Sequence, residues 1–212
     1  SAAIVKLDEA TGVMFYMARD GENFMKMQLH RVGLDGKGDV RLTDPKFNHT
    51  VGACGAGGGG GRGGGGGAGG GGGACGISPD NKYFVDVYQT HDQAPASQVV
   101  DATNGKVVAQ LAKSDLAKFD QIGLKKVEMF TYLAADGKTT LYGTISFPSN
   151  FDPAKKYPAL ASVYGGPGSA VTNENFAMPS ATAEYGFLML QVSSRSAPGQ
   201  GRRVLDSAYM KL

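Results

Sequence analysis

Serine and histidine side chains are the groups in this sequence that could carry out nucleophilic catalysis. Serine hydrolases built on an α/β sheet place the nucleophile in a Gly-x-Ser-x-Gly elbow, and no such pentapeptide occurs in the 212 residues. Ser169 follows a glycine directly and Ser78 lies in a Gly-Ile-Ser-Pro-Asp turn, so we expect neither on a strand-to-helix elbow. His30, His49 and His91 are expected on loops or on the surface rather than as catalytic bases. The chain alone is therefore predicted to be inactive as a serine hydrolase.

Cys54 and Cys75 are the two cysteines of the chain. A disulfide between them would stabilise the fold by roughly 3 kcal/mol through loop closure and would suit an oxidising compartment. The spacing leaves open both a disulfide and two free thiols. Two cysteines and scattered histidines do not make a zinc spacing, and the Gly-Gly-Pro-Gly turn lacks the Gly-Lys-Ser/Thr of a phosphate loop. We expect no metal and no cofactor.

The cysteines bracket a glycine-rich insert, residues 52–76, in which 18 of 25 residues are Gly. Its centre consists of three six-residue units, 57–62, 63–68 and 69–74, each with five glycines. In a polyproline-II helix a six-residue period is two turns, which would place the non-glycine residues on one edge and allow self-association through 52–76. Because glycine loses more entropy on ordering than other residues, a flexible loop is the competing interpretation.

Outside the insert the composition is that of a globular protein. Hydrophobic residues make up 42% of the chain, and 21 basic residues against 19 acidic ones give a net charge of +2. This balance does not favour nucleic acid or an anionic membrane as a partner, and no apolar stretch approaches the roughly 20 residues of a membrane span. Because the chain starts with Ser-Ala-Ala and has neither an initiator Met nor a signal pattern, we expect an internal segment of a longer protein.

The first part of the chain, which contains the histidines and cysteines, is predicted to form short strands separated by tight turns. Apolar alternation and Asp-Gly or Asn-Gly corners predict two successive four-stranded meanders within residues 1–125, with recognisable strands at 13–17, 25–29, 40–43, 83–88, 98–101 and 107–111. Two such meanders are typical of β-propeller blades. A β-sandwich is the alternative.

The pattern changes in residues 126–212. A hairpin is predicted at 129–147, followed by a buried strand at 159–164, a helix at 176–185 that Pro179 interrupts, and a second buried strand at 187–192. Continuous apolar strands of this kind are typical of parallel sheets covered on both faces. Strand, loop, helix and strand in this order predict the start of an α/β domain.

Three neighbouring segments resemble a known family. They are Lys156-Tyr157-Pro158, the apolar strand that follows, and the run from Val163 to Ser169, which reads Val-Tyr-Gly-Gly-Pro-Gly-Ser. Together with the preceding meanders, they resemble the prolyl oligopeptidase family of serine peptidases (peptidase S9), most closely the dipeptidyl peptidase IV branch. The resemblance implies the last blades of a β-propeller in 1–125 and the incomplete start of an α/β-hydrolase catalytic domain in 126–212.

The resemblance also implies roles for individual residues. Tyr164 corresponds to the tyrosine whose hydroxyl helps to form the oxyanion hole; Gly165, Gly166 and Arg195 are supporting residues. A donor in that loop stabilises the tetrahedral intermediate. The family usually has Asp-x-Arg-Gly after the second buried strand, whereas this chain has Ser-Ser-Arg-Ser, so only the arginine matches.

The predicted function is thus that of a segment of a periplasmic or extracellular serine peptidase that hydrolyses short peptides through an acyl-enzyme. The expected partners are a peptide substrate and the rest of the parent chain. Two alternatives remain open: a structural or assembly module organised by glycine-rich segments, and a non-catalytic relative of the family.

Overall fold

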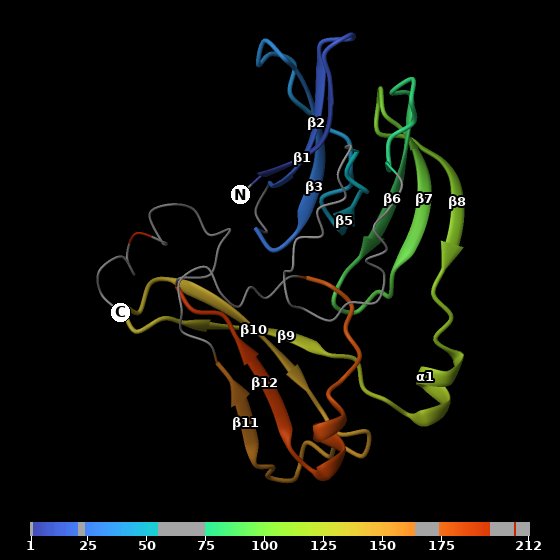
Figure 1. The fold of residues 1–212 in the computed structure, drawn as a ribbon. Helices are drawn as coiled ribbons and strands as arrows, with labels where there is room; N and C mark the ends of the chain where they lie inside the picture. Colours follow the sequence, from blue (N-terminus) through green and yellow to red (C-terminus); the bar gives the residue numbers. More distant parts are fainter. Residues whose placement is uncertain (1, 21–23, 55–74, 164–173, 196–205, 207–212) are drawn as a thin grey trace. The chain divides into compact units, whose positions relative to one another are not determined.

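The computed structural model describes residues 2–20, 24–54, 75–163, 174–195 and 206. These residues form three four-stranded sheets and little helix (Figure 1). By their internal contacts they divide into two compact units. Unit 1 contains Ser1–Gln89 and Pro95–Lys113, and unit 2 contains Thr90–Ala94 and Ser114–Leu212.

The first sheet of unit 1, sheet A, is an antiparallel meander in the order β1-β2-β3-β4. Its strands are β1 (Ala2–Asp8), β2 (Val13–Arg19), β3 (Met27–Gly33) and β4 (Val40–Arg41). Gly12 and Gly36 turn the chain with positive φ, which glycine adopts without strain. Tyr16 and His30 pair across β2 and β3, and their rings stack with centroids 5.1 Å apart.

The second sheet, sheet B, repeats the meander in the order β5-β6-β7-β8. Its strands are β5 (Asn48–Thr50), β6 (Tyr83–Gln89), β7 (Ala96–Asp101) and β8 (Val107–Lys113). The glycine-rich insert therefore connects β5 and β6, two neighbouring antiparallel strands.

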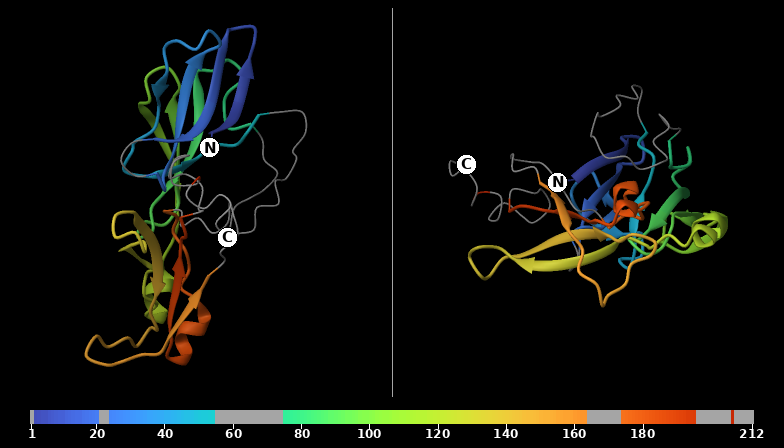
Figure 2. Two further views of the ribbon diagram at one scale, coloured as in Figure 1. Left: turned by 90° about the vertical axis from the view of Figure 1, so that its left-hand side faces the viewer. Right: turned by 90° about the horizontal axis from the view of Figure 1, so that it is seen from below.

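Sheets A and B share one hydrophobic core, and Figure 2 shows their blue and green strands side by side. The buried members of this core are Val5, Phe15, Met17, Leu29, Leu42, Val51, Ile77, Phe84, Val100 and Ala102. Two consecutive four-stranded antiparallel meanders packed in this way are the arrangement of propeller blades.

Unit 2 contains sheet C, in the order β11-β12-β10-β9. Its strands are β9 (Glu128–Leu133), β10 (Thr140–Ser146), β11 (Ala159–Ser162) and β12 (Leu188–Val192). The β9–β10 and β10–β12 pairs are antiparallel, whereas β11 and β12 are parallel. Helix α1 (Ala117–Ile122) precedes the sheet and buries Phe119.

Gly143 lies at the centre of sheet C, where β10 passes between β9 and β12. A Cβ atom at this position would lie 2.7 Å from the carbonyl oxygen of Gln191 and 2.5 Å from Cζ of Phe130. The aromatic ring on β9 thus occupies the space that a side chain on β10 would need, and only glycine fits this register.

The expected fold class is confirmed: antiparallel meanders are followed by a sheet with a parallel strand pair. Three details were wrong. The helix predicted at 176–185 is reduced to the 3₁₀ turn η1 (Ala181–Tyr185), because Pro179 cannot donate to a helix and Ser180 caps the turn by accepting from the Thr182 amide.

The second error concerns β11, which was expected to be buried on both faces. All four of its residues are exposed, because β11 is the edge strand of sheet C and pairs with β12 alone among the described strands. The third concerns two histidines. His30 and His49 lie on β3 and β5 and are only 7% and 2% exposed, so they are not surface residues.

Candidate functional site

The carboxyl ends of β11 and β12 define the edge of sheet C at which the sequence places its candidate residues. The strands are parallel with Ser162 paired to Gln191, so the chain leaves both strands at the same edge (Figure 1). In α/β sheets this is where ligands and catalytic loops gather. Tyr164 follows β11 by two residues in the sequence. Tyr164, Gly165 and Gly166 lie outside the described residues, whereas Arg195 is described.

Ser193, the first residue after β12, is fixed at this edge by two hydrogen bonds of its backbone. Its amide donates to the carbonyl oxygen of Tyr142 on β10 (3.0 Å). Its own carbonyl oxygen accepts from the hydroxyl of Tyr132 on β9 (2.5 Å). The residue is 4% exposed. The chain therefore leaves β12 along a defined path beside β9 and β10.

Arg195 pairs with Asp136, which lies in the tight turn between β9 and β10. Nη1 of Arg195 lies 3.3 Å from Oδ2 of Asp136. The turn is the predicted Asp-Gly corner, with Gly137 at φ 65°. Hydrogen bonds to the Asp136 carboxylate, first from the Thr139 hydroxyl, then from the amides of Thr139 and Lys138, hold its pKa well below the usual range, and the charge of Arg195 adds to this effect. The carboxylate is thus ionised and oriented.

Each of the three histidines faces a carboxylate. His49 is buried on β5, and its Nδ1 lies 2.9 Å from both carboxylate oxygens of Asp86 on β6. His30 lies between Asp20 and Asp39, at 3.3 and 3.2 Å. These pairs are structural ion pairs or hydrogen bonds of the propeller-type unit.

The third histidine, His91, lies on the β6–β7 connection within unit 2. Its Nδ1 is 3.3 Å from Oε1 of Glu174, the residue at which the described chain resumes after the Tyr164 segment. Lys126 donates to the carbonyl oxygen of Asp92, 2.6 Å away. The turn at residues 90–94 is therefore held by unit 2.

Sequence reasoning missed the His49–Asp86 pair. One signal was available: Asp86 alternates with Val85 and Val87 and shares the core-facing side of its strand with Phe84, which is 1% exposed. A carboxylate in a core-facing position needs a partner. His49 was the candidate, but its proximity depends on the pairing of β5 with β6.

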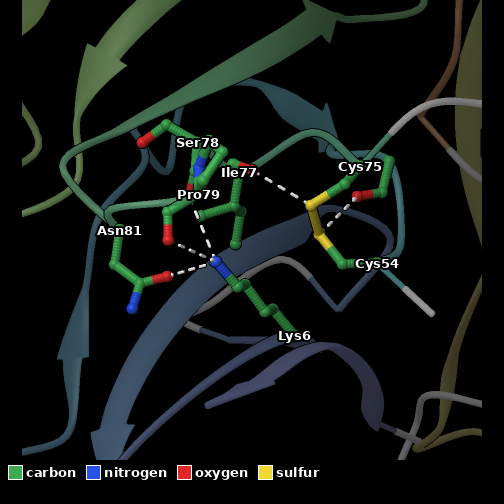
Figure 3. The surroundings of a disulfide bond; sticks show 8 residues. Lys6, Cys54, Cys75, Ile77, Ser78, Pro79 and Asn81 are labelled. Atoms are coloured by element: carbon green, nitrogen blue, oxygen red, sulfur yellow. Dashed lines mark hydrogen bonds between the residues drawn. A yellow bond between two sulfur atoms is a disulfide. The ribbon is translucent and has the colours of Figure 1, made fainter. Parts of the chain in front are cut away.

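Cys54 and Cys75 form a disulfide at the base of the glycine-rich insert, with their Cα atoms 4.3 Å apart (Figure 3). Two backbone hydrogen bonds flank it, from Cys54 N to the Val5 carbonyl (2.6 Å) and from Gly76 N to the Gly52 carbonyl (2.9 Å). A Cβ atom on Gly76 would lie 2.7 Å from Gly52 N, so this approach requires glycine. The two ends of the insert are therefore held together.

Lys6 links the two meanders next to the disulfide. Its ammonium group donates to Oδ1 of Asn81 (2.6 Å) and to the Ser78 carbonyl (3.1 Å) in the turn before β6 (Figure 3). Asn81 adopts a positive φ of 57° and donates through its amide group to Asp8. The turn at residues 78–82 is thus anchored to β1 from both sides.

The described residues offer no metal site, since no group of three or more His, Cys, Asp or Glu side chains lies in a metal-binding arrangement among them. In the same part of the chain no helix is long and apolar enough to cross a membrane. The candidate site is the strand-exit edge of sheet C, whose described part contains the Asp136–Arg195 ion pair.

Comparison with curated proteins gives matches to peptidases. The chain is 36% identical to mouse prolyl endopeptidase FAP over 94 residues, which is 43% of this chain and 12% of the mouse protein. It is 29% identical over 106 residues to an Aspergillus niger protein of the dipeptidyl-peptidase 5 type, covering 49% of this chain and 15% of that protein. No protein-family model matches the chain.

Solved structures match over nearly the whole chain. A dipeptidyl aminopeptidase IV-type protein from Bacteroides ovatus superimposes with a TM-score of 0.71 and 22% identity over 97% of this chain. Dipeptidyl peptidase 4 from Porphyromonas gingivalis gives a TM-score of 0.69 and 17% identity over 98% of the chain. By these matches the chain is similar to peptidases of the prolyl oligopeptidase family, dipeptidyl peptidase IV-like proteins among them. At these identities the solved structures support the fold only.

This dipeptidyl peptidase IV-like chain spans a small part of each relative: 12% and 15% of the two curated proteins and 26% of each solved structure. What the segment does supply is the strand-exit edge of sheet C.

Proposed function

We propose that this segment belongs to a serine-type peptidase that hydrolyses short peptides through an acyl-enzyme, and that Tyr164 donates a hydrogen bond to the oxyanion. The observation that carries the proposal is the parallel pairing of β11 with β12, in which Ser162 lies opposite Gln191. Tyr164 comes two residues after β11. In α/β-hydrolases the loop that supplies oxyanion donors also follows a strand of the parallel sheet.

The domain assignment is part of the same proposal. Residues 1–125 would be the last blades of a propeller, with the insert at 52–76, and residues 126–212 the start of the catalytic domain. The similarity to a prolyl endopeptidase and to a dipeptidyl-peptidase supports this class of substrate. The Cys54–Cys75 disulfide supports a periplasmic or extracellular location, since disulfides persist in oxidising compartments.

The chemistry that Tyr164 would perform is electrostatic. When a serine oxygen attacks a peptide carbonyl, negative charge develops on the carbonyl oxygen, and a donor aimed at that oxygen stabilises the transition state more than the substrate. The nucleophile must come from outside these 212 residues, which lack Gly-x-Ser-x-Gly. Gly165 and Gly166 would let the backbone approach the substrate closely.

The test uses the full-length protein and a chromogenic Xaa-Pro substrate. Tyr164→Phe removes one hydroxyl, and we expect kcat to fall roughly 100- to 1,000-fold with KM little changed, as for the loss of other oxyanion donors. The isolated 212-residue chain should show no turnover. An unchanged kcat in Tyr164→Phe would refute the oxyanion role of Tyr164. Absence of turnover by the full-length protein would refute its assignment as a peptidase.

A further inference from the structure

The hairpin formed by β9 and β10 contacts the segment after β12 at two separate points. Near its end β9 presents Tyr132, whose hydroxyl donates to the Ser193 carbonyl at 2.5 Å. The turn presents Asp136, which accepts from Arg195 at 3.3 Å. One contact fixes the backbone as it leaves β12, and the other fixes the side chain two residues later. The hairpin therefore determines both the path of the segment and the direction of its guanidinium.

The Asp136 carboxylate is itself held by its own turn. Oδ1 accepts from the amides of Lys138 (2.9 Å) and Thr139 (2.8 Å), and Oδ2 accepts from the Thr139 hydroxyl (2.6 Å). With Oδ1 occupied by the backbone, Oδ2 is the oxygen that meets Arg195. A carboxylate anchored in this way cannot follow a mobile arginine, so the arginine must adopt the position that the carboxylate offers.

The ion pair is too exposed to serve mainly as a source of stability. The side chains of Arg195 and Asp136 are 39% and 34% exposed, and pairs of this kind typically contribute little to folding. Its geometric effect is larger, because it fixes one end of a long and flexible side chain at the edge where β11 and β12 both end. If the pair positions Arg195, breaking it should release that side chain with little change in folding stability. If the pair is purely structural, breaking it should lower the folding stability.

We propose that Asp136 and Tyr132 are positioning residues for the peptidase site: they hold residues 193–195, and with them the Arg195 guanidinium, at the edge where β11 and β12 both end. This inference rests on the proposed function. Asp136 acts through Arg195, and Tyr132 acts through the Ser193 carbonyl. Neither residue was singled out by the sequence for a role in the site.

The first experiment uses the 212-residue chain and needs no activity. Asp136→Asn keeps the acceptor for the turn amides but removes the charge, and Tyr132→Phe removes only the hydroxyl. We expect both to accelerate amide hydrogen exchange at residues 193–195 by about tenfold, while the melting temperature shifts by no more than about 2 °C. The matched control is Asp152→Asn, in another exposed turn where Asp152 pairs with Lys155 at 3.6 Å. It should leave exchange at 193–195 unchanged.

The second experiment uses the full-length enzyme and a double-mutant cycle. We expect Asp136→Asn to lower kcat about tenfold with KM changed less than twofold, and to have no further effect in an Arg195→Ala background. An Asp136→Asn effect that persists without Arg195, or unchanged exchange at 193–195, would overturn the proposal.

The two proposals fail in different ways. If the full-length protein does not cleave the substrate, the proposed function is wrong, and the exchange measurements still decide whether the hairpin fixes residues 193–195. If Tyr164→Phe lowers kcat as expected but the Asp136 variants retain wild-type kcat, the peptidase assignment stands and the positioning role is wrong.

Discussion

The Cys54–Cys75 disulfide allows a quantitative prediction because the loop that it closes is long and consists mainly of glycine. The cysteines are separated by 21 positions in the sequence. For a loop of this length the chain-entropy relation gives about 3.3 kcal/mol of stabilisation at 25 °C. Glycine has the most conformational freedom in the unfolded chain, so this segment should follow the relation closely. The double substitution Cys54→Ser with Cys75→Ser should therefore destabilise unit 1 by about 3 kcal/mol.

The structure also predicts what the substitution leaves intact. The hydrogen bond from Gly76 N to the Gly52 carbonyl joins the two ends of the insert, and the bond from Cys54 N to Val5 ties one end to β1. Both use backbone atoms, so the ends of the insert still meet without the disulfide. The loss should therefore come from the unfolded state rather than from disorder in the folded one. A second variant separates the two causes: deletion of residues 57–68 shortens the disulfide loop to 9 positions, which the same relation converts to about 0.7 kcal/mol less stabilisation.

The assay is urea denaturation monitored by hydrogen exchange of β6 and β7 peptides, which report on unit 1. Oxidised wild type, reduced wild type and the serine double variant are compared. Reduced wild type and the serine variant should agree with each other and lie about 3 kcal/mol below the oxidised protein. A difference below about 1 kcal/mol between the oxidised protein and the two forms without the disulfide would refute the entropic account. The same holds if the oxidised shortened-loop variant gains as much stability from its disulfide as the oxidised full-length loop does.

Three further predictions concern the sheets and the ion pair. Gly143→Ala should destabilise unit 2 by about 1–3 kcal/mol in urea denaturation, because the new methyl group would meet the Gln191 carbonyl at 2.7 Å; wild-type stability would show that β10 can shift. His49→Phe should destabilise unit 1 by about 3–5 kcal/mol, because the buried Asp86 carboxylate keeps the hydrogen bond from Gln98 but loses its imidazole partner. Adding Asp86→Leu should recover part of the loss; purely additive losses would contradict this pairing. The Asp136 pKa is depressed, so its contribution to stability is present above the ordinary value of 3.8 and lost only as the pH falls through the lower, folded-state value. Carbon NMR should show a midpoint well below 3.8 that Thr139→Val raises, whereas an ordinary midpoint would contradict the hydrogen bonding in the turn.

Local signals were sufficient to predict most of the strands and their turns, although β1 (Ala2–Asp8) and β5 (Asn48–Thr50) were not among the strands expected. Asp136-Gly137 predicted a hairpin corner, and the structure has that corner with Gly137 at φ 65°. The alternation around Phe84 predicted a strand at 83–88, and the structure has β6 there (Tyr83–Gln89). Such features depend on residues that are neighbours in the sequence, which is why one sequence can reveal them.

The features that were missed depend on contacts between distant residues. The His49–Asp86 pair spans 37 positions and the Asp136–Arg195 pair spans 59. Each forms only after strands have paired in one register, and no local pattern specifies that register. The error at 176–185 has a local cause, since Pro179 and the cap at Ser180 outweigh the apolar spacing that suggested a helix. Tyr164, Gly165 and Gly166 lie outside the described residues, so their roles stay predictions.

The surroundings of Ser193 explain how this chain tolerates its departure from the Asp-x-Arg-Gly pattern. Ser193 is 4% exposed, and its backbone is bonded on both sides, to Tyr142 and Tyr132. An aspartate in this position would bury a carboxylate, which is costly unless a cation neutralises it. Arg195 is the nearby cation, but Asp136 already pairs with it from the hairpin turn. A serine at 193 and an anchored carboxylate at 136 are therefore a consistent set: the charge that balances Arg195 comes from a turn 59 residues upstream, where it remains hydrated.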